Sequence, residues 1–175
     1  MISPEYVRLM AAYTRWQNAS LYAAADTLTD AARREDRGAF FGSIHATLDH
    51  LLWGDRIWLH RLAGAPAPEA SDIPSSVSQH ADWGALKAAR QLTDEAIAEW
   101  AGRVTAEELA GELAWFSGSR GVEVRRPRWA LAVQLFNHGT HHRGQVHAML
   151  TAAGAQPEDT DIQYLPAAFY SWPTP

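Results

Sequence analysis

The chain has no cysteine among its 175 residues. Disulfide bonds, thiolate metal sites and a cysteine nucleophile are therefore excluded. The absence fits a reducing compartment, and we expect a cytoplasmic protein. No run of about 18 apolar residues is present, so no membrane-spanning helix is expected. The N-terminal segment also lacks the apolar stretch of a signal peptide, because Arg8 and Arg15 interrupt it.

The chain also lacks an excess of positive charge, since its formal net charge is -5. Proteins that bind nucleic acids generally carry a basic patch or stripe. We therefore expect neither a nucleic acid nor a membrane as a partner. The hydrophobic fraction of 47% and the charged fraction of 20% are ordinary for a globular protein. The length predicts a single domain that covers residues 1–175.

Four segments of the chain have apolar residues at helical spacing. Their approximate bounds are 4–28, 41–63, 81–101 and 127–153. Between the third and fourth segments, apolar residues on both sides of the turn sequence GSRG predict a short β-hairpin. The pattern predicts an all-α protein, a four-helix bundle with more than half of its residues helical.

The last predicted helix contains the stretch NHGTHHRGQ at residues 137–145. Residues four apart lie on one face of a helix, one turn above the other, so His138 and His142 can point at the same ion. Their face also carries apolar residues, which indicates that it is turned toward the core. His141 lies to one side of this face, and His147 points nearly the opposite way.

The helix predicted at 41–63 offers a third imidazole. At ~100° per residue, its polar residues share a wedge about 60° wide: His45, Asp49, Arg56 and His60. His50 lies outside that wedge, so it is a candidate ligand together with His138 and His142. Core histidines with backbone or hydroxyl partners explain the same pattern, and periodicity alone does not decide between the two interpretations. The remaining histidines are interpreted as solvated or rim residues: His45, His60, His80 and His147.

Several segments resemble the DinB-like family of bacterial metal-binding bundles. Within residues 41–59, the stretches FGSI, TLDH and WL are similar to the family's second-helix pattern, which carries one ligand histidine. Within residues 135–146, LFNH and HHRGQV are similar to its fourth-helix pattern, which carries the other two. The HHRGQ stretch is the most specific part of a resemblance that spans most of the chain.

The resemblance implies that His50, His138 and His142 bind one divalent transition metal in an up-up-down-down bundle. Zinc or nickel is favoured, and iron and manganese are the alternatives. The better understood relatives include thiol-dependent transferases and a thiol-dependent isomerase. The resemblance therefore implies a small-molecule substrate and a low-molecular-weight thiol as partners. It also implies a homodimer, which a second apolar side of the last helix, with Trp129, Phe136 and Leu150, would support unless the C-terminal tail covers that side.

Two functions are consistent with these residues. In the first, the protein is an enzyme, a transferase or hydrolase, whose ion activates a thiol or water toward an electrophilic small molecule. In the second, it is a non-enzymatic protein in which the ion ties two helices together. No fourth ligand stands out, which favours the enzyme. Catalytic residues are unknown: Asp55 is the nearest carboxylate, and a structural ion pair explains it equally well. Gln145 lies on the ligand face and is interpreted as a hydrogen-bond partner of a ligand.

Overall fold

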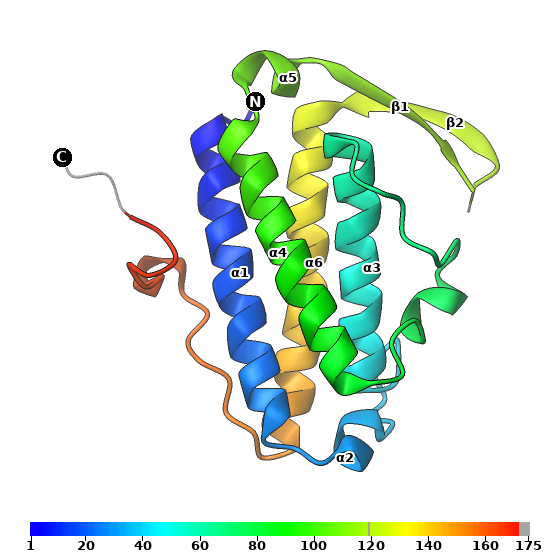
Figure 1. Cartoon of the computed structure of the whole chain (residues 1–175), viewed down its shortest axis with the longest axis vertical. Coiled ribbons are helices and arrows are strands. Elements are labelled where there is room, and N and C mark those ends of the chain that lie inside the picture. Colours follow the sequence, from blue (N-terminus) through cyan, green and yellow to red (C-terminus); the bar gives the residue numbers. More distant parts are fainter. Residues whose placement is uncertain (119, 172–175) are drawn as a thin grey trace.

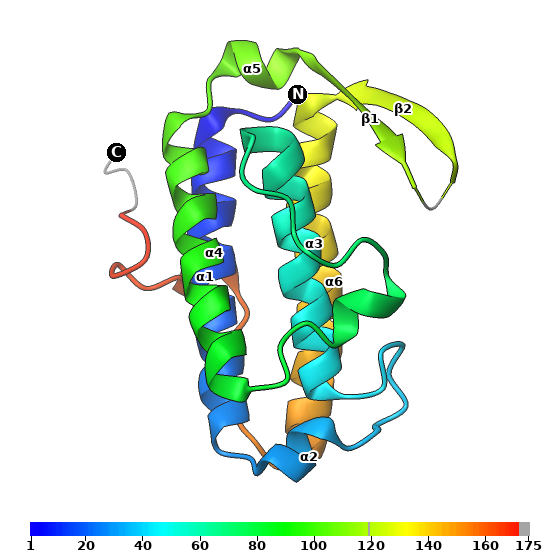
Figure 2. The same cartoon turned by 45° about the vertical axis from the view of Figure 1, so that its right-hand side comes forward.

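The structure is a computed structural model that describes residues 1–118 and 120–171. Four long helices lie side by side (Figures 1 and 2): α1 (Pro4–Asp26), α3 (Ile44–Ala63), α4 (Trp83–Arg103) and α6 (Arg128–Ala152). Helix α1 packs against α4 and α6, and α3 packs against the same two helices. Helices make up 62% of the described residues, which confirms the prediction of a mainly helical protein.

The directions of the four long helices differ from the expected up-up-down-down arrangement. Helices α3 and α4 run in the direction opposite to α1 and α6 (Figure 1). An up-up-down-down order would need two long crossover connections. In this protein α3 and α4 are the only consecutive long helices that run parallel, so a single long crossover connection is needed. Residues 64–82 supply that connection and carry the short helix η1 (Pro74–Val77).

Smaller elements lie between and after the long helices. Helix α2 (Asp30–Arg34) follows α1, α5 (Ala106–Ala110) follows α4, and η2 (Ile162–Tyr164) lies in the C-terminal segment. Strands β1 (Glu112–Ser117) and β2 (Val122–Pro127) pair antiparallel, so the predicted hairpin is confirmed. The indole ring of Trp115 in β1 contacts that of Trp58 in α3, with centroids 5.8 Å apart, which holds the hairpin on the helices.

Side-chain caps explain where the long helices begin. Helix α1 begins at Pro4, as predicted, and the Ser3 hydroxyl accepts a hydrogen bond from the Tyr6 amide. Helix α3 begins at Ile44 and not near residue 41, because the Ser43 hydroxyl accepts from the amide of Ala46. Its predicted end is confirmed, since Gly64 follows with a left-handed φ of 71°.

The interior consists of two apolar clusters with a polar layer between them. One cluster includes Val7, Trp100 and Phe136, and the other includes Leu21 and Leu150. Between them, the middle of each long helix contributes buried polar side chains: Thr14, Gln17, Asn18, His50, Asp55, Arg90, Thr93, Asp94, His142 and Arg143. Buried polar groups are costly unless they have partners, so this polar layer constrains all four helices at once.

Arg90 is the principal cation of the polar layer. Its Nη1 donates to Oδ2 of Asp55 at 2.6 Å, and its Nη2 lies 2.8 Å from Oδ1 of Asp94. The same oxygen of Asp94 accepts a hydrogen bond of 2.8 Å from the amide nitrogen of Asn18. These contacts join α1, α3 and α4 through side chains that are almost fully buried.

The connection between α3 and α4 folds back over the polar wedge of α3. Both the backbone amide and Nδ1 of His80 donate to the carboxylate of Asp49, at 3.0 and 2.7 Å. The ring of His45 donates from Nε2 to the carbonyl of His80 at 2.7 Å. The prediction that His45 is a solvated residue is therefore wrong, because this connection covers it. His60, near the end of the helix, is exposed as predicted.

The second apolar side of α6 is largely covered by the chain itself, with Trp129 only partly buried. Phe136 and Leu150 are both buried in the two clusters. They therefore need no second subunit, and the homodimer stays a prediction. The C-terminal segment lies instead along α1, where Trp16 Nε1 donates to the carboxylate of Glu158 at 2.8 Å. None of the helices in the described residues has the length and hydropathy required to span a bilayer.

We expect the polar layer to depend on the charge of Arg90. The substitution Arg90→Met keeps most of the volume but leaves Asp55 and Asp94 buried without a cation. Removing one partner of a buried ion pair costs about 3–5 kcal/mol, and we expect a loss of this size in the free energy of unfolding, measured by urea denaturation.

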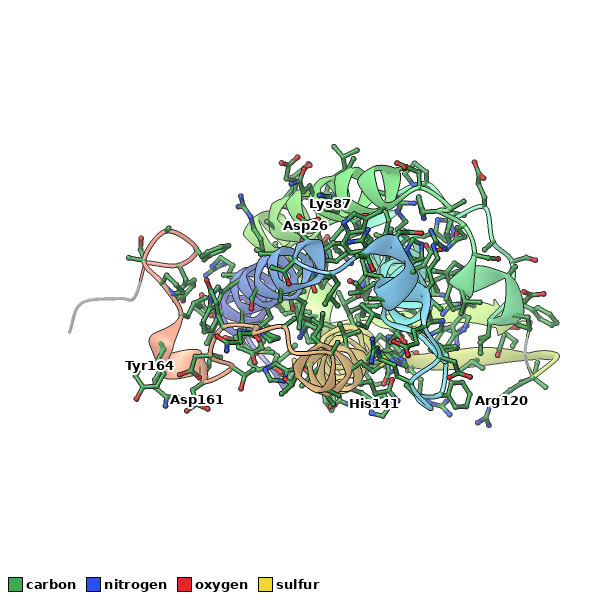
Figure 3. All side chains as sticks on the ribbon, turned by 90° about the horizontal axis from the view of Figure 1, so that it is seen from below. Asp26, Lys87, Arg120, His141, Asp161 and Tyr164 are labelled. Atoms are coloured by element: carbon green, nitrogen blue, oxygen red, sulfur yellow. The ribbon has the colours of Figure 1, made fainter. Side chains whose placement is uncertain are left out.

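Lys87→Met is the matched control on the same helix. Lys87 pairs with Asp26 at 2.8 Å, but their side chains are 35% and 45% exposed, and they lie together at the surface (Figure 3). Such a pair contributes about 1 kcal/mol or less. Similar losses for the two variants would contradict the role given to the polar layer.

Candidate metal centre

Three histidines meet where α3 packs against α6. His50 comes from α3, and His138 and His142 come from successive turns of α6. Their potential ligand nitrogens all lie within 4.8 Å of one another. The Nε2 atoms of His138 and His142 are 3.1 Å apart. Among the described residues, this triad is the only group of three or more histidine or carboxylate side chains with such geometry.

Hydrogen bonds orient two of the three rings. The hydroxyl of Ser76, in η1, donates to the carbonyl of Ile73 at 2.6 Å, so its oxygen accepts from Nδ1 of His50 at 2.7 Å. The side-chain oxygen of Gln145 accepts from Nδ1 of His142 at 2.7 Å. Because Nδ1 carries the proton in both rings, Nε2 of each presents a lone pair to the centre of the triad. This is the arrangement in which partners of Nδ1 orient metal-bound histidines.

The third ring fits closely against a glycine of the facing helix. A Cβ atom added to Gly54 would lie 2.7 Å from Cε1 and 3.1 Å from Nδ1 of His138. Helix α3 can approach this imidazole only because residue 54 has no side chain. Nδ1 of His138 is buried and has no hydrogen-bond partner in the described part of the chain. Packing therefore holds the His138 ring in place. Its Nε2 atom faces Nε2 of His142.

The electrostatic environment keeps the three imidazoles neutral. Burial first, and then the neighbouring imidazoles, lower the pKa of His50 to about 3 and that of His138 to about 4. Burial also lowers the pKa of His142. At neutral pH each ring therefore keeps a nitrogen lone pair, which a metal ligand requires. Lone pairs of neutral rings that converge on one point fit a bound cation.

Aromatic rings surround the triad. The ring of Phe41 lies 4.0 Å from that of His50 and 5.5 Å from that of His142, measured between centroids. The indole ring of Trp53 lies 5.5 Å from the His50 ring. His141, which is exposed, contacts the His142 ring from the other side at 4.9 Å. The rings of Phe41 and Trp53 give the surroundings of His50 and His142 an apolar character.

The structure brings together the three histidines expected to act as ligands. Gln145 bonds to His142, as interpreted from the sequence. Asp55 is bonded to Arg90 at 2.6 Å, so the ion-pair explanation of this carboxylate is the right one and it is not a free base.

Gly54 and Ser76 were not among the residues predicted to shape the site. Glycine within a helix is destabilising relative to alanine by about 1 kcal/mol, and this was the available signal for a close contact at position 54. Ser76 lies in a connection without periodicity, and no pattern in the sequence pointed to it.

Comparisons with known proteins concern the family and the fold of the chain. The sequence model of the DinB family matches residues 1–170. A crystal structure of a DinB-like protein from Bacillus cereus ATCC 10987 aligns with a TM-score of 0.62, at 16% sequence identity, over 83% of this chain and 91% of that chain. At that identity the likeness concerns the fold alone. No curated protein matches the chain.

We predict that Gly54→Ala disrupts the triad. The new methyl group would overlap the His138 ring and displace it, so the amount of cobalt bound by the purified protein should fall sharply. Gly144→Ala is the control, because it places the same substitution in α6, the helix that carries His138 and His142, where a Cβ meets nothing within 4 Å. If both alanine variants bind cobalt as the wild type does, the close contact at Gly54 is not needed for the site.

Proposed function

This chain belongs to the DinB family, and we propose that it is a metal-dependent enzyme with one divalent transition ion bound by His50, His138 and His142. The proposal rests mainly on one observation, the convergence of three neutral imidazoles from two facing helices, of which those of His50 and His142 are buried and that of His138 is half-buried. We also propose that the four long helices form a four-helix bundle of the DinB type. In such bundles, facing helices supply side chains that build metal sites in the core.

The donor set guides the proposed choice of metal. Three imidazole nitrogens without a thiolate suit zinc and nickel, with iron and manganese as alternatives. In the described residues, the group contains no carboxylate that would favour a hard cation. Zinc sites with three protein ligands are typically catalytic, because the fourth position takes water or substrate. The number of donors is thus the main reason to prefer an enzyme.

The proposed chemistry is the activation of a nucleophile, either a low-molecular-weight thiol or water, toward an electrophilic small molecule. A divalent ion with three neutral donors would supply this chemistry by favouring the deprotonated form of the nucleophile. The chain has no cysteine, so a thiol would come from solution. Ser76 and Gln145 would keep two ligand rings in place, and Phe41 and Trp53 would limit access of water.

The alternative proposal is a structural ion that ties α3 to α6. The burial of His50 and His142 is the observation that favours it, since a deeply buried ion is remote from substrates. The two proposals differ in whether a small molecule can reach the ion. A thiol that binds the ion directly would support the enzyme.

We predict that cobalt-loaded protein shows a thiolate-to-metal charge-transfer band when a small thiol such as 2-mercaptoethanol is added. The cobalt absorption bands should be lost in the His138→Ala/His142→Ala variant, because only one donor of the triad remains. They should persist in His147→Ala, which removes a histidine of the same helix outside the triad. Intact cobalt bands that no thiol changes would contradict the thiol-activation proposal and favour hydrolysis or a structural ion.

A further inference from the structure

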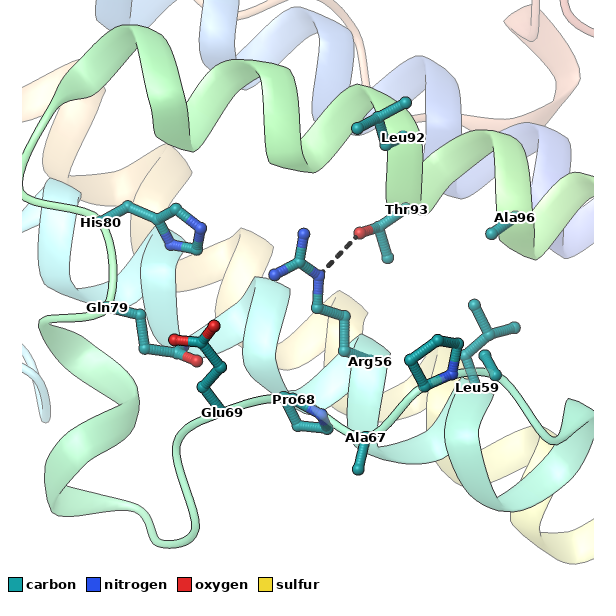
Figure 4. Close-up of a pocket in the computed structure, with 12 residues that line it drawn as sticks. Arg56, Leu59, Ala67, Pro68, Glu69, Gln79, His80, Leu92, Thr93 and Ala96 are labelled. Carbon is teal, nitrogen blue, oxygen red and sulfur yellow. Dashed lines mark hydrogen bonds between the residues drawn. The ribbon is translucent and has the colours of Figure 1, made fainter.

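A second candidate site lies between α3 and α4. Figure 4 shows a cleft of about 420 Å³ with Arg56 at its centre, which we name the Arg56 cleft. Its walls come from α3, from α4 and from the connection between them, chiefly Leu59, Leu92, Pro68 and His80. Pockets for small molecules commonly measure about 300–1,000 Å³. At ~100° per residue, Arg56 points about 120° away from His50 around α3, so the cleft is separate from the triad.

The guanidinium of Arg56 is held in a fixed orientation. The hydroxyl of Thr93 donates to the carbonyl of Ala89 at 2.8 Å, so its oxygen accepts from Nε of Arg56 at 3.1 Å. This bond is drawn in Figure 4, where the two terminal nitrogens of Arg56 project into the cleft. Those two nitrogens carry four N–H donors in a planar fork. Such a fork matches the two oxygens of a carboxylate or phosphate.

Arg56 has no anionic partner in contact with it. The side chain is half-buried, and burial lowers its pKa, as does the nearby cation Arg90. Asp49 and Glu69 act on it only through their charge, and neither is bonded to it in the described part of the chain. Asp49 is already bonded to His80. A partly desolvated cation without a bonded counterion is unfavourable, and a bound anion would offset that cost.

The rest of the cleft identifies the kind of anion. Leu59, Pro66, Pro68, Leu92 and Ala96 give it apolar walls next to the guanidinium. Leu92 is 65% exposed, so an apolar ligand would cover a leucine that now faces water. A phosphate ion would satisfy the guanidinium but leave these walls uncovered. A carboxylate with a short apolar chain would use both features.

We propose that the Arg56 cleft binds a small organic carboxylate, whose oxygens pair with the guanidinium of Arg56 and whose apolar chain lies against Leu59 and Leu92. The exposed carboxylate of Glu69 at the rim disfavours ligands with additional negative charge. The site does not depend on the proposed metal chemistry.

The test is a calorimetric titration of the full-length protein with hexanoate. We expect one binding event per chain, and no binding of hexylamine, which has the same apolar chain and the opposite charge. Inorganic phosphate, which has no apolar chain, should bind more weakly than hexanoate. Phosphate binding as tight as that of hexanoate would overturn the assignment, because the apolar walls would then contribute nothing.

Substitutions of two arginines in α3 test whether hexanoate binds in the Arg56 cleft. Arg56→Gln should weaken hexanoate binding by at least about tenfold, since a charge-assisted bidentate contact is lost. Arg61→Gln is the matched control, because Arg61 is half-buried on the same helix but lies over the rings of Trp58 and Trp115, outside the cleft. Circular dichroism of each variant would establish that it is folded.

Glu69→Gln provides a readout that keeps both the guanidinium of Arg56 and the apolar walls of the cleft. Because it removes a negative charge near the ligand, it should tighten hexanoate binding by about two- to threefold. This variant also tests the proposal if Arg56→Gln fails to fold. If hexanoate binds Arg56→Gln as well as the wild type but fails to bind His138→Ala, the carboxylate is bound at the metal centre and the proposal is overturned.

Discussion

The polar layer in the middle of the helices is the constraint on which the arrangement of this protein depends. Imidazoles, carboxylates and guanidinium groups lie there between two apolar clusters, where an unpaired polar atom is costly. Arg90 therefore pairs with Asp55 and Asp94, and Ser76 and Gln145 hold the rings of His50 and His142. The Arg90–Asp55 pair joins α4 to α3 and the Ser76–His50 bond joins η1 to α3, whereas the Arg90–Asp94 and Gln145–His142 contacts lie within α4 and within α6. The close approach at Gly54 lets α3 pack against α6 in the register that brings the histidine triad together.

The connection at residues 64–82 links the parts of the molecule that we consider functional. Its helix η1 places Ser76 against His50, and the two residues Gln79 and His80 lie at the Arg56 cleft. The side-chain amide of Gln79 donates to the carbonyl of Ser76 at 3.2 Å. One short segment therefore contacts the histidine triad on one side and the cleft on the other. A parallel pair of helices requires such a long connection, and the fold uses it to complete both sites.

Much of the fold follows from local patterns in the sequence. The helical spacing of apolar residues predicted all four long helices. This was possible because the apolar face that a helix buries is encoded within its own segment. The spacing of His138 and His142 likewise placed two imidazoles on one face. Features that depend on contacts between distant segments were harder to predict. His45 and Asp49 are buried by a connection whose path no periodicity encodes, and Ser76 lies in that same connection. The meaning of Gly54 becomes clear only when α3 and α6 are packed together.

The central claim is that His50, His138 and His142 together bind one metal ion while leaving a coordination position for a small molecule. The most direct measurement is a crystal structure of the protein, purified without a histidine tag or added metal, with anomalous diffraction data. Our account predicts one anomalous peak per chain within bonding distance of the Nε2 atoms of all three histidines, and at least one ligand of the ion from solvent. A triad without an ion, or an ion whose coordination is completed by protein atoms alone, would contradict it.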